Sequence, residues 1–406
     1  MNKTKTKEFK ETEIGKIPAD WEIKPFVDCV ENNVGESKKS ELKRFYKAQG
    51  KYPIIDQGKK LIAGYSDDES KVYKKSIPII IFGDHTRILK YIDFPFITGA
   101  DGTKLLKANR EFFEDKFLYF ALRRLNIPNR GYNRHFKILK EHFVPCPSKP
   151  EQQKIAYVLS KIQKAIENQE KLSSYLRELK SSTIAKLFRE GTCGEPLKQT
   201  EIGEIPQSWD VGTLSSVCDK TTTINPTKTP DKIIEYVDVS SVSSKQCRII
   251  NSTKYLGKDV PGRARKLVNY KDVIFATVRP TLRRVALVPK ELDNQVVSTA
   301  FCIIRAKKPK AYPEYIYYVV SSANFITKIG RLQRGANYPA VTDGNVLSQL
   351  IAIPEYKGQK EIANILDCIS KKEDFARKKL DELNSLFNST LNQLMTGKVR
   401  VKDLNI

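Results

Sequence analysis

Basic and polar side chains that can contact nucleic acid cluster beside the expected turns of this 406-residue chain. An arginine fork can hold guanine, an asparagine amide can hold adenine, and arginine and lysine can both hold phosphate. The candidates for DNA contact, drawn from two separate stretches, are Lys59, Lys60, Arg87, Lys104, Arg130, Asn133, Arg134, Arg263, Arg265, Arg279, Arg283, Arg284, Arg334, Asn337 and Tyr338. A solvated surface charge is the commoner role for any one of them. We therefore predict DNA contact from the groups, not from a particular member.

The charge of the whole chain favours the same chemistry. Lys and Arg number 71 against 47 Asp and Glu, which gives a formal net charge of +24. A surplus of basic residues favours binding to DNA, because each neutralised phosphate releases counterions. Ribosomal and membrane-surface proteins can be equally basic. The apolar run at 77–83 is far shorter than a bilayer span, and no apolar stretch follows the charged N-terminus. We expect no membrane segment and no signal peptide.

Residues that would carry catalysis on DNA do not form a recognisable set. There are three histidines without a metal constellation, and His85, in IFGDHT, fits a turn better than a catalytic site. The sequence has no GxxxxGK[ST] phosphate loop and no acidic nuclease cluster, and Asn225-Pro226 lacks the rest of an NPP[YF] methylation motif. The seven cysteines lack CxxC spacing, which is typical of reduced cytoplasmic thiols. We expect a cytoplasmic, non-catalytic protein that binds no metal and no cofactor.

The elements that must position these side chains occur twice. Residues 12–23 (TEIGKIPADWEI) and 200–211 (TEIGEIPQSWDV), here called the IPxxW segments, are identical at seven of twelve positions, and each contains one of the two tryptophans. A second pair, 152–162 (QQKIAYVLSKI) and 359–369 (QKEIANILDCI), follows a short apolar stretch ending in proline. The inserts between them share little sequence. We infer a duplicated frame with a common docking role that carries two different recognition inserts.

Each repeat ends in a long predicted helix. Between Pro150 and Gly191 the chain contains neither proline nor glycine, and Gly397 closes the second helix. Apolar residues alternate at steps of three and four, as in a coiled coil. The predicted seam residues are Ile155, Val158, Ile162, Leu172, Leu176, Leu179, Leu366, Ile369, Leu380, Leu383, Phe387 and Leu394. Each helix would be roughly 50 to 60 Å long at about 1.5 Å per residue. We predict that the helices bury their seams on each other in antiparallel fashion, not each on its own half alone.

Both inserts are predicted to be α+β modules, because short strand-like runs separated by turn residues precede a helical stretch. The first has runs at 51–56, 77–82 and 91–97 with a helix at 112–125, and the second has runs at 233–239, 272–278, 285–289 and 301–306 with a helix at 313–322. The predicted domains are a first recognition domain (1–148), a central spacer helix (149–191), a second recognition domain (192–354), and a distal spacer helix with a tail (355–406). The predicted fold is α+β with a pseudo-twofold internal repeat.

Taken together, these motifs resemble the specificity subunit of type I restriction-modification systems, over nearly the whole chain. The resemblance is carried by TEIGKIPADWEI at Thr12, FVPCPSKPEQQKIAYVL at Phe143, TEIGEIPQSWDV at Thr200, QKEIANILDCI at Gln359 and LMTGKVRV at Leu394. IFGDHTR at Ile81 and TVRPTLRRVALVP at Thr277 resemble strand-turn segments of that family's recognition domains. One departure is EYKGQK at the second helix start, where the family usually has a proline-rich PPxxEQ segment.

The resemblance implies that each insert is a target recognition domain that reads one half of an asymmetric, bipartite double-stranded DNA site. It also implies that the helices set the spacer between the half-sites, and that two adenine-methylating modification subunits and further restriction subunits are the protein partners. Base flipping and methyl transfer would belong to those partners. Three alternatives stay open: a specificity subunit of a methyltransferase-only or type IIB-like system, a free-standing sequence-specific DNA-binding regulator, and, against the residue inventory, a nucleic-acid-modifying enzyme.

Overall fold

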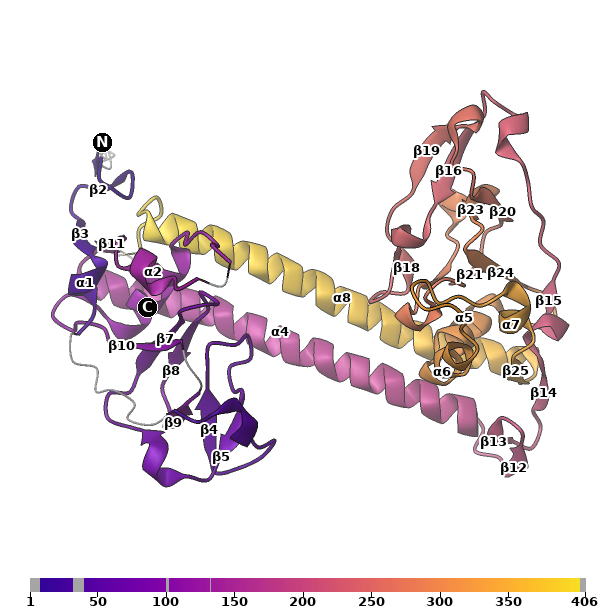
Figure 1. The fold of residues 1–406 in the computed structure, drawn as a ribbon, viewed down its shortest axis with the longest axis horizontal. Helices are drawn as coiled ribbons and strands as arrows, with labels where there is room; N and C mark the ends of the chain where they lie inside the picture. Colours follow the sequence, from indigo (N-terminus) through magenta and orange to yellow (C-terminus); the bar gives the residue numbers. More distant parts are fainter. Residues whose placement is uncertain (1–7, 32–39, 100–101, 132, 402–406) are drawn as a thin grey trace, which may run out of the picture. The chain divides into compact units, whose positions relative to one another are not determined.

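The computed structural model describes residues 8–31, 40–99, 102–131 and 133–401. The chain forms two compact units: unit 1 comprises residues 1–171 and 378–406, and unit 2 comprises residues 172–377. Each unit holds one module of strands and short helices and one part of each long helix, α4 (Lys149–Glu190) and α8 (Tyr356–Met395) (Figure 1). The boundary between the units therefore runs through both long helices.

The module of unit 1 contains two small sheets and a covering helix. In the first sheet β7 (Ile79–Gly83) lies between β10 (Thr103–Leu106) and β8 (Leu89–Ile92), antiparallel to both. The second sheet has the order β5-β4-β9-β6, with β4 and β9 parallel, and consists of β4 (Tyr52–Ile55), β5 (Gly64–Ser66), β6 (Val72–Tyr73) and β9 (Phe96–Thr98). The helix α2 (Asp115–Arg124) packs on β7 and β8. The run 91–97, predicted as one strand, is divided between β8 and β9.

The module of unit 2 repeats this plan, with one strand more in the first sheet. One sheet has the order β15-β24-β21-β22 and consists of β15 (Cys218–Asp219), β21 (Val273–Ala276), β22 (Val285–Leu287) and β24 (Phe301–Ala306). The other has the order β19-β16-β23-β20 and consists of β16 (Ile233–Val237), β19 (Thr253–Leu256), β20 (Ala264–Val268) and β23 (Gln295–Ser298), with β16 and β23 parallel. The helices α5 (Pro313–Ser321) and α6 (Ala323–Arg331) follow. The predicted α+β class with an internal repeat is confirmed.

In each unit, the two segments that are similar in both repeats lie side by side. In unit 1, β3 (Glu22–Pro25) pairs antiparallel with β11 (Phe143–Cys146), and in unit 2, β14 (Asp210–Thr213) pairs with β25 (Leu350–Ile353). Each pair joins the end of an IPxxW segment to the strand that leads into a long helix. The remaining short elements are α1 (Phe26–Cys29), α3 (Phe136–Leu139), α7 (Asp343–Leu347), β1 (Phe9–Lys10), β2 (Ile17–Pro18), β12 (Leu197–Thr200), β13 (Gly203–Pro206), β17 (Val242–Ser243) and β18 (Arg248–Ile249).

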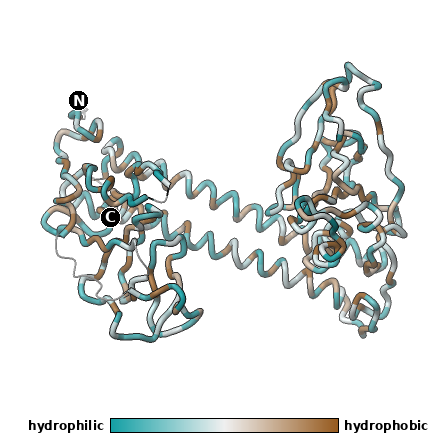
Figure 2. Tube along the Cα trace, viewed as in Figure 1, coloured by the Kyte–Doolittle hydropathy of each residue, from teal (hydrophilic) through white to brown (hydrophobic). Residues whose placement is uncertain are grey.

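Within each unit the two long helices pair in opposite directions. In unit 1 the N-terminal part of α4 and the C-terminal part of α8 share one core, through Ile155 and Leu159 on α4 and Phe387 on α8. In unit 2 the C-terminal part of α4 and the N-terminal part of α8 share the other core, through Leu187 and Leu366. The predicted antiparallel pairing is therefore present in both units. In Figure 2 hydrophobic residues are frequent in each module, while hydrophilic residues are frequent along both long helices.

The predicted seam is right for α8 and partly wrong for α4. Leu366, Phe387 and Leu394 are buried, as is Ile155 on α4, and the other seam residues are half-buried, namely Val158, Ile162, Leu176, Ile369, Leu380 and Leu383. Leu172 and Leu179, however, are 46% and 50% exposed, and the neighbouring Ser173 and Lys180 face inward instead. The spacing of apolar residues along α4 is compatible with two possible inward faces that differ by one residue. Near the helix start, the residues of both faces are apolar. The packing partners on α8, among them Glu373 opposite Lys180, decide between them.

Each long helix ends at a glycine that lies against the proline and tryptophan of an IPxxW segment. Gly191 and Gly397 both have φ of +65°, and an added Cβ would stand 3.1 Å from Trp209 Cζ2 at Gly191. At Gly397 the same atom would collide with Pro18, 2.2 Å away. The predicted C-cap glycines are thus confirmed, because the left-handed turn and the close approach both require a residue without a side chain.

Candidate nucleic-acid interface

The turn between β21 and β22 and the loop after α6 in unit 2 are joined by main-chain hydrogen bonds. We call residues 277–284 and 332–341 the unit 2 loop pair. The Arg279 amide donates to the Pro339 carbonyl at 2.7 Å, and the Val341 amide donates to Thr277 at 3.0 Å. Arg334 and Ala340 exchange two further bonds, at 3.0 and 2.9 Å. These contacts bring together four predicted DNA-contact residues that are distant in sequence, namely Arg279, Arg334, Asn337 and Tyr338.

Arg279 is the most constrained side chain of this group. Its backbone is left-handed, with φ of 48°, a conformation that is uncommon for residues other than glycine. Its guanidinium carbon lies 5.1 Å from the centroid of the Tyr338 ring, and Nη2 donates to the Asn337 carbonyl at 3.2 Å. Tyr338 is 72% exposed. The loop pair therefore presents an oriented guanidinium and an aromatic ring to solvent.

Other predicted DNA-contact arginines bind main-chain carbonyls of their own unit. Arg283 Nη2 donates to Ser321, at the end of α5, at 2.9 Å. In unit 1, Arg87 Nη1 donates to Ile127, just after α2, at 2.9 Å, and both arginines have positive φ. Arg284 Nη1 donates to the Val239 carbonyl at 2.5 Å. Arg87 and Arg283 thus occupy matching places in the two modules, where Arg283 binds the last carbonyl of α5, which the helix leaves free, and Arg87 binds a carbonyl three residues beyond the end of α2.

Unit 1 has a corresponding loop pair, residues 83–88 and 126–136. The Asp84 carbonyl accepts from the His135 amide at 2.8 Å and from its Nδ1 at 2.9 Å, and Asp84 Oδ1 accepts from the Phe136 amide at 2.8 Å. His135 is completely buried, and its Nε2 accepts from the Arg130 amide at 3.2 Å. Around this structural histidine the predicted residues Arg130, Asn133 and Arg134 are exposed.

The remaining predicted DNA-contact residues lie outside the two loop pairs. Lys59 and Lys60 are exposed in the turn after β4. Lys104, on β10, is half-buried, with Nζ 5.7 Å from the Phe136 ring centroid. Arg263 lines a small cleft with Tyr236 and Asp238, whereas Arg265 is half-buried on β20. The two loop pairs therefore contain six of the candidates in unit 2 and four in unit 1, and the other five lie elsewhere in the two modules.

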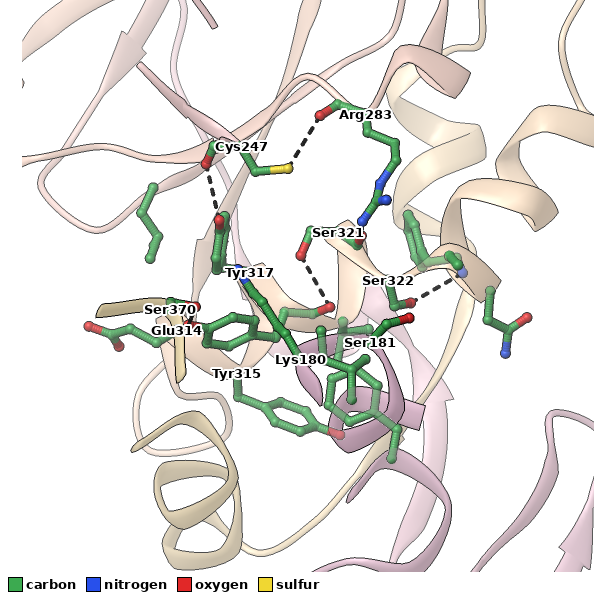
Figure 3. Close-up of a pocket in the computed structure, with 18 of the residues that line it drawn as sticks. Lys180, Ser181, Cys247, Arg283, Glu314, Tyr315, Tyr317, Ser321, Ser322 and Ser370 are labelled. Carbon is green, nitrogen blue, oxygen red and sulfur yellow. Dashed lines mark hydrogen bonds between the residues drawn. The ribbon is translucent and has the colours of Figure 1, made fainter. Parts of the chain in front are cut away.

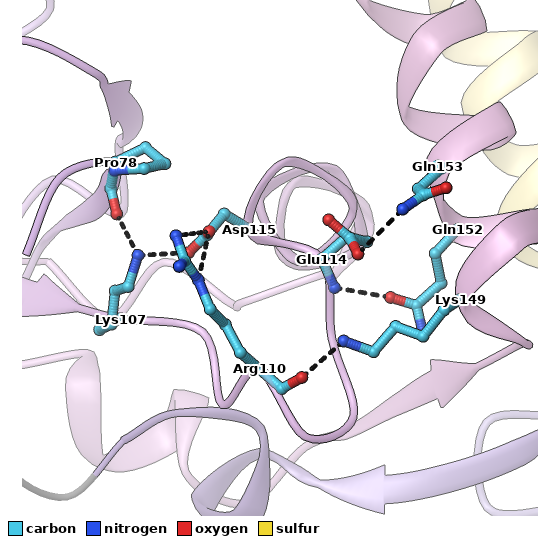
Figure 4. A network of polar contacts seen from close by, with 8 residues as sticks. All are labelled: Pro78, Lys107, Arg110, Glu114, Asp115, Lys149, Gln152 and Gln153. Atoms are coloured by element: carbon cyan, nitrogen blue, oxygen red, sulfur yellow. Dashed lines mark hydrogen bonds and ion pairs between the residues drawn. The ribbon is translucent and has the colours of Figure 1, made fainter.

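A glutamine that recurs in the two sequence repeats has a structural role that its sequence position does not indicate. Gln152 is fully buried at the start of α4, where Oε1 accepts from the Glu114 amide at 2.8 Å (Figure 4). Its Nε2 donates to the Phe112 and Pro147 carbonyls. Gln359 makes the same three contacts in unit 2, with the residues Tyr312, Lys310 and Pro354. One glutamine in each unit therefore fixes the recognition module to the first turn of a long helix.

A charged cluster in unit 1 connects the segment after α8 to the first IPxxW segment. Arg400 donates to both carboxylate oxygens of Glu151, at 2.6 and 2.7 Å, and to both of Asp20, at 2.8 Å. Trp21 Nε1 also donates to Glu151, at 3.1 Å. These hydrogen bonds from Glu151 and Asp20 raise the pKa of the Arg400 guanidinium. The motifs around these residues were recognised in the sequence, but nothing there indicated that they meet.

Unit 2 contains a cavity of about 940 Å³ that opens between α4, α5 and α8 (Figure 3). Tyr317 donates to the Cys247 carbonyl at 3.0 Å along one wall, and burial raises the pKa of Tyr317. Lys180 lines another wall and pairs with Glu373 at 3.3 Å. In the aligned repeats, Lys180 and Tyr318 correspond to Phe387 and Phe120, whose rings are in contact in unit 1, 6.0 Å between centroids. A pair of rings in one unit is thus replaced by polar side chains in the other.

No helix in the described part of the chain has the length and apolar character needed to cross a membrane. Among those same residues, no group of three or more His, Cys, Asp or Glu side chains is arranged to hold a metal ion.

Comparison with known proteins gives consistent results across most of the chain. A family model described as "Type I restriction modification DNA specificity domain" matches residues 18–174 and 206–385. A putative type I restriction enzyme MjaX specificity subunit of Methanocaldococcus jannaschii is 28% identical, with 98% of each chain covered. The HindI specificity subunit of Haemophilus influenzae is 30% identical over 39% of this chain and 32% of its own length. The crystal structure of a type I restriction-modification S subunit from M. genitalium is similar in fold, with a TM-score of 0.62, 16% identity, and coverage of 92% of this chain and 96% of that one.

Proposed function

The chain belongs to the type I restriction modification DNA specificity family, and from that premise we propose that each of its two modules reads one half of an asymmetric, bipartite DNA site. Its general role is DNA sequence recognition within a type I complex, and this role is non-catalytic. The observation that carries the proposal is the repeated frame. Equivalent strands, helix starts and glutamines support two loop pairs with different exposed side chains. Two recognition modules with different exposed side chains on one repeated frame suit a DNA site whose two halves differ in sequence.

Double-stranded DNA is the proposed ligand of both modules. The surplus of basic residues supports contact with phosphate, and the exposed arginines and asparagines of the loop pairs have the donors that base edges require. The cores that hold the loops are separate in the two units. A change in one loop pair is therefore expected to alter one half-site only.

The long helices are the proposed docking surface for two methyltransferase subunits, which restriction subunits then join. Several large apolar side chains on them are exposed, in contrast to the buried seam. In unit 1 these are Tyr157 and Leu386, and in unit 2 they are Leu172, Tyr175, Leu179, Ile365 and Phe375. Clustered exposed apolar side chains favour protein partners. Methyl transfer and its cofactor would belong to the methyltransferase subunits, in a cytoplasmic complex.

Domain boundaries at 148, 191 and 354 remain part of the proposal. These boundaries assign each long helix to a spacer of its own, whereas each compact unit contains a part of both helices. Residues 402–406 of the proposed tail lie outside the described residues.

Copurification followed by methylation mapping tests the proposed function. The chain is co-expressed with a methyltransferase subunit of its own operon, and methylated adenines are mapped across the host genome. We expect a stable complex and one bipartite motif, and replacement of residues 24–142 by another family member's insert should change one half of that motif. Methylation that is independent of this chain, or a swap that alters both halves, would contradict the proposal.

Two alternatives predict different results. A specificity subunit of a methyltransferase-only or type IIB-like system would give the same motif, but no restriction subunit would be encoded beside it. A free-standing regulator would bind its site tightly as a purified chain, whereas the type I role predicts weak binding until the methyltransferase subunits are present.

A further inference from the structure

We propose that Arg279 determines one base pair of the half-site read by unit 2, by donating two hydrogen bonds to the O6 and N7 atoms of a guanine. Tyr338 is the positioning residue that holds the guanidinium in place. This inference rests on the proposed function, because it requires unit 2 to read DNA.

The backbone around Arg279 is built to hold this residue at one place. The residue is left-handed at the tip of a turn, and its amide bonds the Pro339 carbonyl in the facing loop. The adjacent Thr277 and Val341 are linked by a second bond across the loop pair. A non-glycine residue in this conformation is strained, and such strain is concentrated at functional sites. The turn is therefore fixed from both sides at the position of the arginine.

The side chain is oriented and still has free donors. Its one hydrogen bond within the described residues is from Nη2 to the Asn337 carbonyl, at 3.2 Å, and no acid among those residues lies within ion-pair distance of it. The exposed Tyr338 ring lies 5.1 Å from the guanidinium carbon. A guanidinium has five N–H donors in a planar fork, so the fork keeps enough donors for a bidentate contact.

An oriented arginine suits a base better than a phosphate. Phosphate binding needs charge but little geometry, and the neighbouring exposed Arg334 already supplies charge to the same loop pair. Bidentate contact with guanine needs the plane of the fork to be set, and this is the commonest specific contact of arginine in the major groove. Arg283, four residues further on, gives the contrast, because it has a similar backbone but binds the Ser321 carbonyl.

The test compares Arg279→Lys with Arg189→Lys in the complete chain, co-expressed with its methyltransferase subunit. Lysine keeps the charge and loses the fork. We expect Arg279→Lys to lower methylation about tenfold at sites with the original guanine and to make that single position degenerate, in one half-site only. Arg189 is an exposed arginine of unit 2 that pairs with Glu204 outside the loop pair, so Arg189→Lys should leave the motif unchanged. If the unaltered chain yields no motif, the proposed function fails, whereas an Arg279→Lys motif identical to the original overturns this inference alone.

A second measurement separates base contact from phosphate contact. Replacing the identified guanine with 7-deazaguanine removes the N7 acceptor, so the unaltered complex should bind about tenfold more weakly, and the Arg279→Lys complex should lose no further affinity. If Arg279→Lys weakens DNA binding equally on all sequences and makes the affinity less dependent on salt, Arg279 contacts a phosphate and the inference is overturned. A unit 2 half-site without a G·C pair would also overturn it.

The role of Tyr338 is tested by mapping the methylation motif of Tyr338 variants, because a measurement of stability would not distinguish positioning from packing. Tyr338→Phe keeps the ring and should keep the motif, while Tyr338→Ala should relax the same base pair as Arg279→Lys. A Tyr338→Ala variant that retains full discrimination at that base pair would remove the positioning role.

Discussion

At the residue scale, a few buried polar groups hold the frame of each unit together. Gln152 and Gln359 are buried, and each uses its side-chain amide to make three hydrogen bonds to main-chain groups. A buried donor or acceptor left unpaired costs about 1 to 3 kcal/mol. This cost explains why the same residue type stands at the same place in both units, although the loops that the two glutamines bind differ in sequence.

Arg400 is expected to be essential for the stability of unit 1. Glu151 is 2% exposed, and Arg400→Ala would leave its carboxylate buried without its cation. Removing one partner of such a pair costs about 3 to 5 kcal/mol, and urea unfolding measured by circular dichroism should show this loss. The control is Arg189→Ala, which breaks an exposed pair with Glu204 in unit 2 and should cost less than about 1 kcal/mol. Equal losses in the two variants would contradict the role assigned to Arg400.

Thiol reactivity offers a second test at this scale. Burial raises the pKa of the Cys218 thiol to about 12, and burial also raises the pKa values of Cys29 and Cys302. Because the thiolate is the reactive form, these cysteines should resist alkylation near pH 7.5, while the exposed Cys193 and Cys368 react. Mass spectrometry of peptides after brief iodoacetamide treatment checks the pattern. Rapid labelling of Cys302 in the folded chain would show that its core opens.

At the scale of elements, the long helices have two different apolar faces. One is the buried seam, and the other consists of exposed residues such as Tyr175 and Phe375, which are 65% and 70% exposed in unit 2. Leu172 and Leu179 belong to the exposed face, which corrects their predicted place in the seam. A stability role and a docking role can therefore be separated by mutation.

The double variant Tyr175→Ser, Phe375→Ser should remain as stable as the unaltered chain and lose affinity for the methyltransferase subunit. Both side chains contribute little to the core, so thermal unfolding should change by no more than a few degrees. Copurification with the methyltransferase subunit should fall by at least tenfold. The matched control Leu366→Ser removes a buried seam residue and should destabilise the chain instead. Undiminished copurification of the double variant would remove these residues from the docking surface.

At the scale of the whole molecule, continuity of α4 and α8 through both units is the feature that bears on function. Helices of 42 and 40 residues run without a break from one unit into the other. A continuous helix changes length only in steps of about 1.5 Å per residue, so the number of residues in the helices is expected to set the spacer of the DNA site.

Deleting seven residues from each long helix should shorten the preferred spacer and leave the half-site sequences unchanged. Seven residues are two turns, or about 10 Å, and their removal keeps the seam in register. About three base pairs span the same length of DNA, at roughly 34 Å per helical turn. Methylome mapping of the variant reads both the spacer and the half-sites. Altered half-sites with an unchanged spacer would count against the helices as spacers.

The architecture could be predicted from the sequence, because the patterns that indicate it are local and repeated. The duplicated IPxxW segments, the apolar period of three and four, and the C-cap glycines predicted two α+β modules and two long helices, and the structure contains them. These features follow from helix geometry and backbone conformation, which neighbouring residues largely fix. The inward face of α4 was less well determined, because the polar Ser173 and Lys180 face inward in place of Leu172 and Leu179, and contacts such as Lys180 with Glu373 are not visible in the sequence.

Only the tertiary structure decided which polar side chains are occupied and which are free. Arg87, Arg279 and Arg283 look alike in sequence, yet Arg87 and Arg283 bind carbonyls near α2 and at the end of α5, whereas the Arg279 guanidinium lies 5.1 Å from the ring centroid of the exposed Tyr338. The meeting of Arg400 with Asp20 and Glu151, and of Arg279 with Tyr338, joins residues far apart in the chain. Hydrogen bonds and ring contacts depend on distances in space, and sequence spacing carries no record of those distances until the chain has folded.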